Sequence, residues 1–219
     1  MCVIPHDDKV YKGGEDAWTA SPTLIAVADG VGGWASKGID PGLFSKQLTK
    51  DIQDIYDNKK GELTLKEILV EAVKRNYNTG SSTAVLASLE EPNLLKTTNL
   101  GDSGYVIYQA IVLGEEKTIF LQKLFRSEEQ QHRFNFPYQC GTGCELPYAA
   151  FDNQHVVTPG KDFVVMGTDG LFDNLYDRDI EACLKPAITS VSEDVFELKD
   201  PDGAAKCIAK KAYDLSHDR

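Results

Sequence analysis

The stretch that most constrains the fold is Leu24–Trp34, which reads LIAVADGVGGW. Its first residues are small or β-branched and apolar, and the run is too short for a helix, so it predicts a buried β-strand. Asp29 ends this strand, and the glycines that follow let the backbone turn tightly and approach a ligand closely. The stretch therefore predicts a carboxylate held at the end of a rigid strand with open space in front of it.

The same design recurs along the chain. A second apolar run ends in Asp169 and a glycine. Glu15 and Asp16 stand just before an aromatic residue, and Asp102 lies in a Gly-Asp-Ser-Gly turn. Each unit alone is more often a turn than a ligand. Gathered carboxylates would repel one another unless a cation neutralised them, and oxygen donors select magnesium, manganese or calcium rather than zinc. The combination predicts a metal site, where two ions could orient a phosphoryl group for in-line attack.

The remaining pattern predicts an α+β layered domain, because groups of strands are separated by pairs of helices. Asp40 and Pro41 are typical of a helix start, and Thr64 opens a capping-box pattern for a second helix. Residues 1–22 are expected to form a loop or edge strand, and residues 126–160 an exposed loop or flap subdomain. Other elements are expected as strands near 82–87, 94–98, 105–108 and 118–124, and as helices near 177–185 and 202–216.

Bulk properties exclude several classes of protein. With 219 residues the chain can form one sizeable core, and its net charge of −11 argues against a nucleic-acid-binding surface. No apolar run approaches the roughly 20 residues of a transmembrane helix, and the first residues do not resemble a targeting segment. Five cysteines give no regular disulfide framework. Cys140 and Cys144 are the closest pair, and two thiols in a loop explain them better than zinc or redox chemistry.

Five motifs, taken in order, resemble those of the protein phosphatase 2C family of metal-dependent protein serine/threonine phosphatases. The resemblance covers most of the chain and implies a single domain over residues 1–219. It also implies a four-layer αββα sandwich of two antiparallel β-sheets flanked by helices, in a monomeric enzyme. The motifs are Glu15-Asp16-Ala17, Ala28-Asp29-Gly30-Val31-Gly32-Gly33, Ser81-Ser82-Thr83-Ala84, Asn99-Leu100-Gly101-Asp102-Ser103 and Gly167-Thr168-Asp169-Gly170-Leu171-Phe172-Asp173-Asn174.

The resemblance implies a role for each acidic residue. Asp29 would bridge two Mg²⁺ or Mn²⁺ ions, the Gly30 carbonyl would bind one of them, and Asp169 the other. Glu15 and Asp16 would support the pair through bound water. Asp29 and Asp169 would thus act in catalysis through metal-bound water that attacks phosphoserine or phosphothreonine. Asp102 and Asp173 match the two positions that the family uses to bind a weaker third ion.

The chain departs from the family pattern in three places. Many members have a histidine general acid where Val31 stands; here the role is vacant or is taken by water or another residue, with His132 and His155 as interior candidates. In place of a phosphate-binding arginine the chain offers Lys12, with Lys9 nearby. No Asp-Asp/Asn strand follows the last expected helix, so the domain lacks its C-terminal strand; that strand is expected to lie outside this sequence, the alternative being an incomplete site.

Other details favour the mitochondrial branch of the family. They are the Asp-Gly-Val-Gly-Gly-Trp run, Gly38-Ile39-Asp40-Pro41, and the segment from Glu129 to Asn135. That branch implies a mitochondrial location and coenzyme Q biosynthesis proteins as partners, besides phosphoprotein substrates in general.

Two alternatives to a phosphatase of this type stay open. One is a catalytically weak or inactive phosphatase-like domain that binds phosphoproteins, motivated by Val31 and the missing last acid. The other is an aspartyl-nucleophile phosphohydrolase built on Asp177 and Asp179. These two carboxylates lie past the strand at an expected helix start, where N-capping explains them better.

Overall fold

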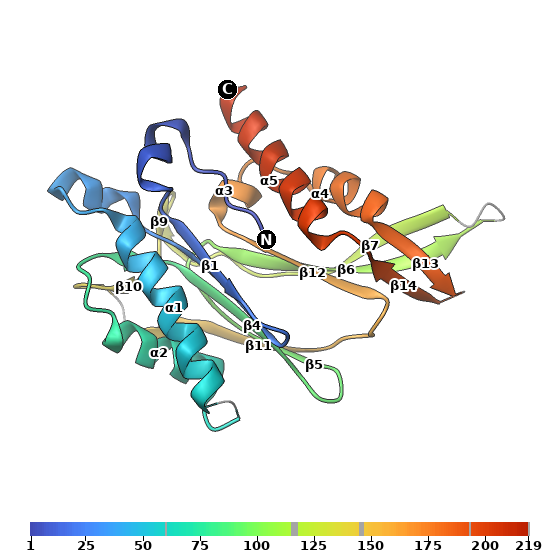
Figure 1. The fold of residues 1–219 in the computed structure, drawn as a ribbon, viewed down its shortest axis with the longest axis horizontal. Coiled ribbons are helices and arrows are strands. Elements are labelled where there is room, and N and C mark those ends of the chain that lie inside the picture. The colour runs from blue at the N-terminus through green and yellow to red at the C-terminus, as the bar shows by residue number, and fades with distance from the viewer. Residues whose placement is uncertain (60, 115–117, 145–146, 193, 219) are drawn as a thin grey trace. The chain divides into compact units, whose positions relative to one another are not determined.

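The computed structural model describes residues 1–59, 61–114, 118–144, 147–192 and 194–218. The chain forms two compact units, each drawn in Figure 1. The first, here called the Asp29 unit, contains Pro5–Gly104 and Glu128–Val156. The second, here called the Asp169 unit, contains Met1–Ile4, Tyr105–Ser127 and Val157–Arg219. The expected α+β architecture with antiparallel sheets and helices is confirmed.

The Asp29 unit is built on a five-stranded antiparallel sheet with the order β1-β2-β4-β5-β11. Two helices pack along this sheet, as Figure 1 shows, with α1 in direct contact with β1 and β2. The bounds of these elements are β1 Asp16–Ala20, β2 Leu24–Asp29, β4 Ala84–Glu90, β5 Leu94–Leu100, β11 Phe151–Val156, α1 Pro41–Lys59 and α2 Leu65–Arg75.

Shorter elements complete this unit. Their bounds are η1 Asp7–Lys12, η2 Gly32–Lys37, β3 Ser81–Ser82, β8 Gln131–Arg133, β9 Phe136–Pro137, β10 Cys140–Gly141 and η3 Pro147–Ala149.

Strand β2 is buried as the opening stretch predicts. Leu24, Ala26 and Ala28, which alternate along the strand, are at most 1% exposed and pack in the core against α1 and α2. Small and branched side chains on this face allow the helices to approach the sheet closely. The strand is thus a fixed support for Asp29 at its end.

Both helix starts lie where the sequence predicts them. Asp40 Oδ1 accepts a hydrogen bond from the Gly42 N–H at 3.0 Å, and Pro41 is the first residue of α1. At the start of α2, Thr64 Oγ1 accepts from the Glu67 N–H at 3.2 Å while Glu67 Oε2 accepts from the Thr64 N–H at 2.8 Å. This reciprocal pair is the predicted capping box.

Loss of this cap has a modest expected effect. Thr64→Ala removes the hydroxyl that satisfies a helix N–H, so we expect a loss of about 1 kcal/mol in the free energy of unfolding. Thr64→Ser keeps the hydroxyl, so its free energy of unfolding should be close to that of the wild type. Denaturant unfolding of the three proteins measures this, and equal losses for the alanine and serine variants would contradict the role of the hydroxyl.

The Asp169 unit combines a three-stranded sheet, in the order β12-β6-β7, with α4 and α5. Val106 and Tyr108 of the sheet share a buried core with Ile180 of α4 and Ile208 of α5. The bounds are β6 Gly104–Leu113, β7 Thr118–Arg126, β12 Asp162–Gly167, α3 Asp169–Phe172, α4 Asp177–Leu184, η4 Lys185–Ala187, β13 Ile188–Ser192, β14 Val195–Leu198 and α5 Pro201–His217.

Several elements differ from the sequence-based expectation. Residues 7–12 form the 3₁₀ helix η1 in a region expected to be a loop or edge strand, and β13 and β14 form a hairpin that was not predicted. Within residues 126–160, of which 145–146 lie outside the described residues, β11 is an edge strand of the five-stranded sheet. A disulfide between Cys183 and Cys207, with Cα atoms 5.6 Å apart, joins α4 to α5 and was not predicted.

Each helix in the described part of the chain is too short or too polar to cross a membrane.

Candidate metal and phosphate site

Acidic residues meet at one end of the five-stranded sheet. Asp16 begins β1 and Asp29 ends β2, and the two are direct partners in the antiparallel register. Opposed residues in such a pair have Cβ atoms about 4.5–5.5 Å apart on the same face, where like charges destabilise the sheet. The fold therefore places two carboxylates in a position that a bound cation would stabilise.

The turn that carries Asp102 lies at the same end, because Leu100 at the end of β5 pairs with Ala84 at the start of β4. Gly101 has φ +99°, and a Cβ there would lie 2.6 Å from the Tyr138 carbonyl oxygen, so only glycine fits. The Ser103 and Thr83 hydroxyls are hydrogen-bonded at 2.7 Å. This close packing fixes the Asp102 turn.

Two further contacts connect that turn to its surroundings. The Thr83 N–H donates to the Asp29 carbonyl oxygen at 3.0 Å, so the residue that holds Ser103 also holds the end of β2. Gln131 Nε2 lies 3.4 Å from Asp102 Oδ2, and Asp102 is only 4% exposed. Gln131 was not identified from the sequence, since no local pattern marks a glutamine as the partner of a distant carboxylate.

Gly30 is held tightly from two sides. Its N–H donates to the Glu15 carbonyl oxygen at 3.1 Å, and a Cβ at this position would lie 2.5 Å from the Pro41 carbonyl oxygen. On the other side, the Val31 N–H donates to the Ser81 carbonyl oxygen at 3.0 Å. A side chain at Gly30 would force the backbone of α1 away, so packing within the chain requires a glycine here, while its close approach to a ligand stays a prediction.

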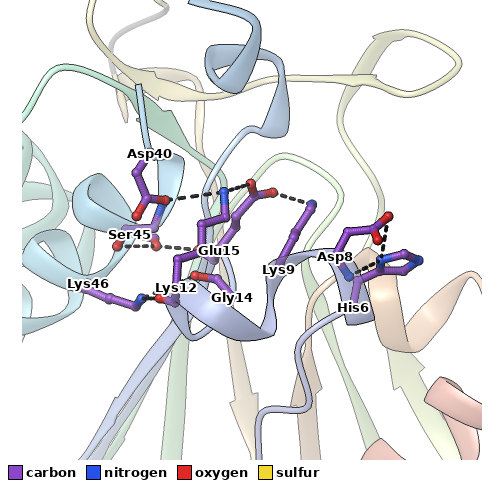
Figure 2. Close-up of polar contacts among 10 residues, drawn as sticks. His6, Asp8, Lys9, Lys12, Gly14, Glu15, Asp40, Ser45 and Lys46 are labelled. Carbon is purple, nitrogen blue, oxygen red and sulfur yellow. Dashed lines mark hydrogen bonds and ion pairs between the residues drawn. The ribbon is translucent and has the colours of Figure 1, made fainter. Parts of the chain in front are cut away.

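The Glu15 carboxylate binds two lysines of η1, as Figure 2 shows. Glu15 is 6% exposed, Lys9 forms an ion pair with its Oε2, and Lys12 Nζ lies 2.8 Å from its Oε1. Lys12 Nζ also lies 3.5 Å from Asp40 Oδ1. These contacts raise the pKa of Lys12, chiefly through the hydrogen bond to Glu15. The partnership of Asp40 was missed because the sequence explained that residue fully as a helix cap.

The position of η1 is fixed by α1. Lys46 Nζ donates to the carbonyl oxygens of Lys12 at 3.0 Å and Gly14 at 3.2 Å, and Ser45 Oγ donates to the Glu15 carbonyl oxygen (Figure 2). Lys9 Nζ lies 3.8 Å from where a Cβ of Gly32 would be. The more exposed of the two lysines thus stands beside the loop that follows Asp29.

Asp169 and Asp173 lie together in the other unit. Asp169 is the first residue of α3, directly after the N-cap residue Thr168, and its carbonyl oxygen accepts from the Asp173 N–H at 2.8 Å. Asp173 borders a cavity of about 260 Å³, whose other lining residues are Arg126, Phe172, Asn174, Leu175, Tyr176 and Asp177. The Arg126 guanidinium lies 4.5 Å from the centre of the Phe172 ring.

The two interior histidines have different surroundings. His155 pairs with Leu95, which pairs with Leu89, whose N–H bonds to Thr23, six positions before Asp29. At roughly 3.3 Å per residue this is about 20 Å along the strand, so His155 lies at the opposite end of the sheet from Asp29. Its pKa is lowered by burial. The His132 ring contacts the Tyr138 ring in a tilted arrangement, with ring centres 4.2 Å apart.

Asp177 and Asp179 begin α4, as the sequence indicated, although the N-cap position belongs to Tyr176. Asp179 Oδ2 accepts from the Tyr176 N–H at 3.1 Å, while Asp177 bonds to the Tyr108 hydroxyl at 3.1 Å and to Lys123. Asp179 therefore acts in helix capping and pairs with Lys211, whereas Asp177 acts in ion pairing and in the hydrogen bond to Tyr108.

The residues of the Asp29 unit fit a hard divalent cation. Asp16, Asp29 and the carbonyl of Gly30 offer oxygen donors only, and magnesium and manganese bind such donors while retaining several waters. Within the described ranges no three His, Cys, Asp or Glu side chains converge on one point. The donor chemistry thus suits an ion that keeps much of its hydration rather than a closed all-protein cage.

Comparison with protein-family models gave no match. Among curated proteins, the chain is 38% identical over its whole length to "Probable protein phosphatase 2C 55" of Arabidopsis thaliana, covering 44% of that protein. It is 33% identical over 97% of its length to "Protein phosphatase PTC7 homolog fig" of Drosophila simulans, covering 69% of it. The chain spans about half the length of the first curated relatives that it matches.

Solved structures agree with these relatives. The X-ray structure of the photosystem II phosphatase PBCP matches with TM-score 0.78 and 30% identity, covering 95% of this chain and 76% of that one. The catalytic domain of the serine/threonine phosphatase PstP in complex with two manganese ions matches with TM-score 0.61 over 92% of this chain and 85% of that one; at 16% identity this shows the fold alone. The sequence and structural likenesses together show that the chain belongs to the protein phosphatase 2C family.

Proposed function

We propose that this chain is a metal-dependent protein serine/threonine phosphatase that hydrolyses phosphoserine and phosphothreonine on proteins. The observation that carries the proposal is the direct pairing of Asp16 with Asp29 beside the tightly held Gly30 peptide, in a member of the phosphatase 2C family. Opposed carboxylates at a strand end are stabilised by a cation and are costly without one.

The proposed ligands follow from this arrangement and from the family resemblance. By the family resemblance, Asp29, the Gly30 carbonyl and Asp169 would hold two Mg²⁺ or Mn²⁺ ions directly, and Glu15 and Asp16 would support them through water. Asp102 and Asp173 are proposed ligands of a third ion. When bound, the ions supply an activated water and neutralise charge on the phosphoryl oxygens. The two manganese ions in the PstP structure support the choice of metal.

Lys12 is the proposed phosphate-binding residue, and its contacts indicate how it would act. Its ammonium is held between Glu15 and Asp40, and the Lys12 side chain is 14% exposed, whereas the Lys9 side chain is 41% exposed. Ammonium groups attract phosphate as point charges, without the two-pronged grip of arginine. We therefore propose that Lys9 meets the phosphate first and that Lys12 adds a fixed positive charge behind it.

The proton for the leaving oxygen is the step that this chain handles differently from many relatives. Val31 has no titratable group, His155 lies at the opposite end of the sheet, and the His132 ring packs against Tyr138. Asp29, Asp16 and the lysines bind and orient, but they do not replace an acid at the leaving group. We propose that solvent water donates this proton.

The direct test is phosphate release from a phosphoserine peptide with manganese or magnesium present. We expect turnover with either ion, loss of turnover on chelation, and recovery when the ion is restored. Calorimetry with a phosphopeptide resistant to hydrolysis runs in parallel. Peptide binding without turnover under every metal condition would contradict the proposal and identify a phosphoprotein-binding domain instead.

The narrower assignment is to the mitochondrial branch, with coenzyme Q biosynthesis phosphoproteins as substrates and a monomeric enzyme. Its support is the likeness to PTC7 homologs, at 33% identity. The likeness to a photosystem II phosphatase, at 30% identity, marks a competing location. A fluorescent fusion of the natural gene product should therefore colocalise with mitochondria, and light scattering should give the mass of one chain; a plastid signal would contradict the assignment.

A further inference from the structure

A chain of two hydrogen bonds, the first partly buried and the second buried, leads away from the loop after Asp29. Trp34 Nε1 donates to Ser81 Oγ at 2.6 Å, and Ser81 Oγ donates to Gln139 Oε1 at 2.6 Å. Ser81 is fully buried and Gln139 is 7% exposed. The serine hydroxyl thus accepts from one side and donates to the other, and it satisfies hydrogen-bonding groups of Ser81 and Gln139 that burial would otherwise leave costly.

The backbone of Ser81 holds the same loop at a second point. Its carbonyl oxygen accepts from the Val31 N–H at 3.0 Å, and its neighbour Ser82 forms an isolated bridge with Gly30. Ser82 Oγ also donates to the Asp29 carbonyl oxygen at 2.7 Å. Strand β3 therefore forms hydrogen bonds to the loop through both its main chain and its side chains.

Gln139 reaches Ser81 from a segment that is itself locked in place. Cys140 and Gly141 pair with Ser82 and Ser81 in the β10–β3 ladder. A Cβ at Gly141 would lie 2.3 Å from the Gly80 carbonyl oxygen, so the two backbones are in close contact. The position of Gln139 is consequently fixed by strand pairing and not by its own side chain alone.

We propose that Trp34, Ser81 and Gln139 are positioning residues that orient the Gly30–Val31 peptide, and through it the carbonyl by which Gly30 binds a metal ion. This inference rests on the proposed function. Glu15 and Pro41 limit the loop on one side, and Ser81 holds it on the other. A peptide plane held from both sides presents its carbonyl in one direction, and this lowers the cost of ordering on metal binding.

The test measures metal affinity directly. Trp34→Phe removes the indole N–H, Ser81→Ala the central hydroxyl and Gln139→Leu the final acceptor. Calorimetric titration with manganese should show binding weakened roughly three- to tenfold in each variant, in line with the loss of one or two hydrogen bonds. The matched control is Trp18→Phe, because Trp18 is 44% exposed on β1. It should bind manganese like the wild type.

Kinetics separates positioning from a general structural role. At saturating manganese the turnover number of the three variants should stay within about twofold of the wild type, while the manganese concentration for half-activation rises. Because the three residues form one chain, Trp34→Phe with Ser81→Ala should bind metal about as well as Ser81→Ala alone. Additive losses in the double variant would overturn the proposal.

A spectroscopic readout needs no turnover. The chain has two tryptophans, so the Trp18→Phe variant reports on Trp34 alone. Its emission should change on addition of magnesium, which is not a quencher, and saturate together with calorimetric binding. Absence of metal binding to the wild type would contradict the proposed function itself. Normal binding with unchanged Trp34 emission and unchanged affinity in the three variants would overturn only the positioning role.

Discussion

Asp29→Asn is expected to lower manganese-dependent phosphate release by more than about a hundredfold, because a direct metal ligand should matter more than the outer-shell groups whose loss costs 10- to 100-fold. Asparagine keeps the shape of the side chain and one oxygen but loses the charge that a divalent ion needs. Turnover of a phosphoserine peptide at saturating manganese is the measurement.

The same substitution should act on stability in the opposite direction. Asp29 faces Asp16 across the β1–β2 pair, so removing one charge relieves repulsion between directly opposed carboxylates. Without metal, we expect the free energy of unfolding of Asp29→Asn to be about 0.5–1 kcal/mol larger than that of the wild type. With manganese the order should reverse, because only the wild type gains free energy from the bound ion.

Asp214→Asn is the matched control for this prediction. Asp214 lies on α5 and forms an exposed ion pair with Lys210 at 2.8 Å, so the same chemical change occurs on the surface of a helix. Both activity and metal-free stability should stay near those of the wild type, since exposed pairs contribute little. Wild-type activity in Asp29→Asn, or a lower metal-free stability, would remove Asp29 from the proposed site.

The sequence predicted what depends on local patterns. Strand β2, the Asp40 and Thr64 helix starts and the helices α4 and α5 are all encoded by periodicity and capping residues. The Asp29 and Asp102 turns could be recognised because glycine marks backbone conformations and close contacts that other residues cannot adopt. These features need no knowledge of distant partners.

What the sequence could not give depends on residues far apart in the chain. Helix η1 has no local periodicity; it is held by Lys46 from α1, which bonds to the Lys12 carbonyl oxygen. The Cys183–Cys207 disulfide arises from the packing of α4 on α5, and an odd number of cysteines pointed away from it. The register that separates His155 from Asp29 likewise appears only once the strands are paired.

Glu15→Gln is expected to cost about 2–3 kcal/mol in the free energy of unfolding. Removing one partner of a buried ion pair leaves the other charge uncompensated. The Lys12 side chain is 14% exposed, and among the described residues its other carboxylate partner is Asp40, at 3.5 Å. The cost stays below the full 3–5 kcal/mol of a deeply buried pair because Lys9 reaches solvent and glutamine still accepts a hydrogen bond. Denaturant unfolding of the metal-free proteins measures the difference.

Glu71→Gln provides the comparison that isolates burial. Glu71 also pairs with two cations, Lys59 at 3.1 Å and Arg75 at 3.7 Å, but its side chain is 32% exposed. Glu71→Gln should lower the free energy of unfolding by less than about 1 kcal/mol, as for other solvent-exposed ion pairs. Equal losses for the two variants would show that the environment of Glu15 adds nothing to its lysine contacts.

The pH dependence supplies a second check on Glu15. Its hydrogen bond raises the pKa of Lys12 above the usual 10.5, so the folded state holds the proton more tightly than the unfolded chain. The resulting stability is fully present below about pH 10.5 and is lost as the pH rises through the higher folded-state pKa. The difference in unfolding free energy between wild type and Glu15→Gln should therefore be constant from neutral pH to about pH 10 and shrink above it. A difference that persists unchanged into strong alkali would mean that shape, and not charge, makes Glu15 stabilising.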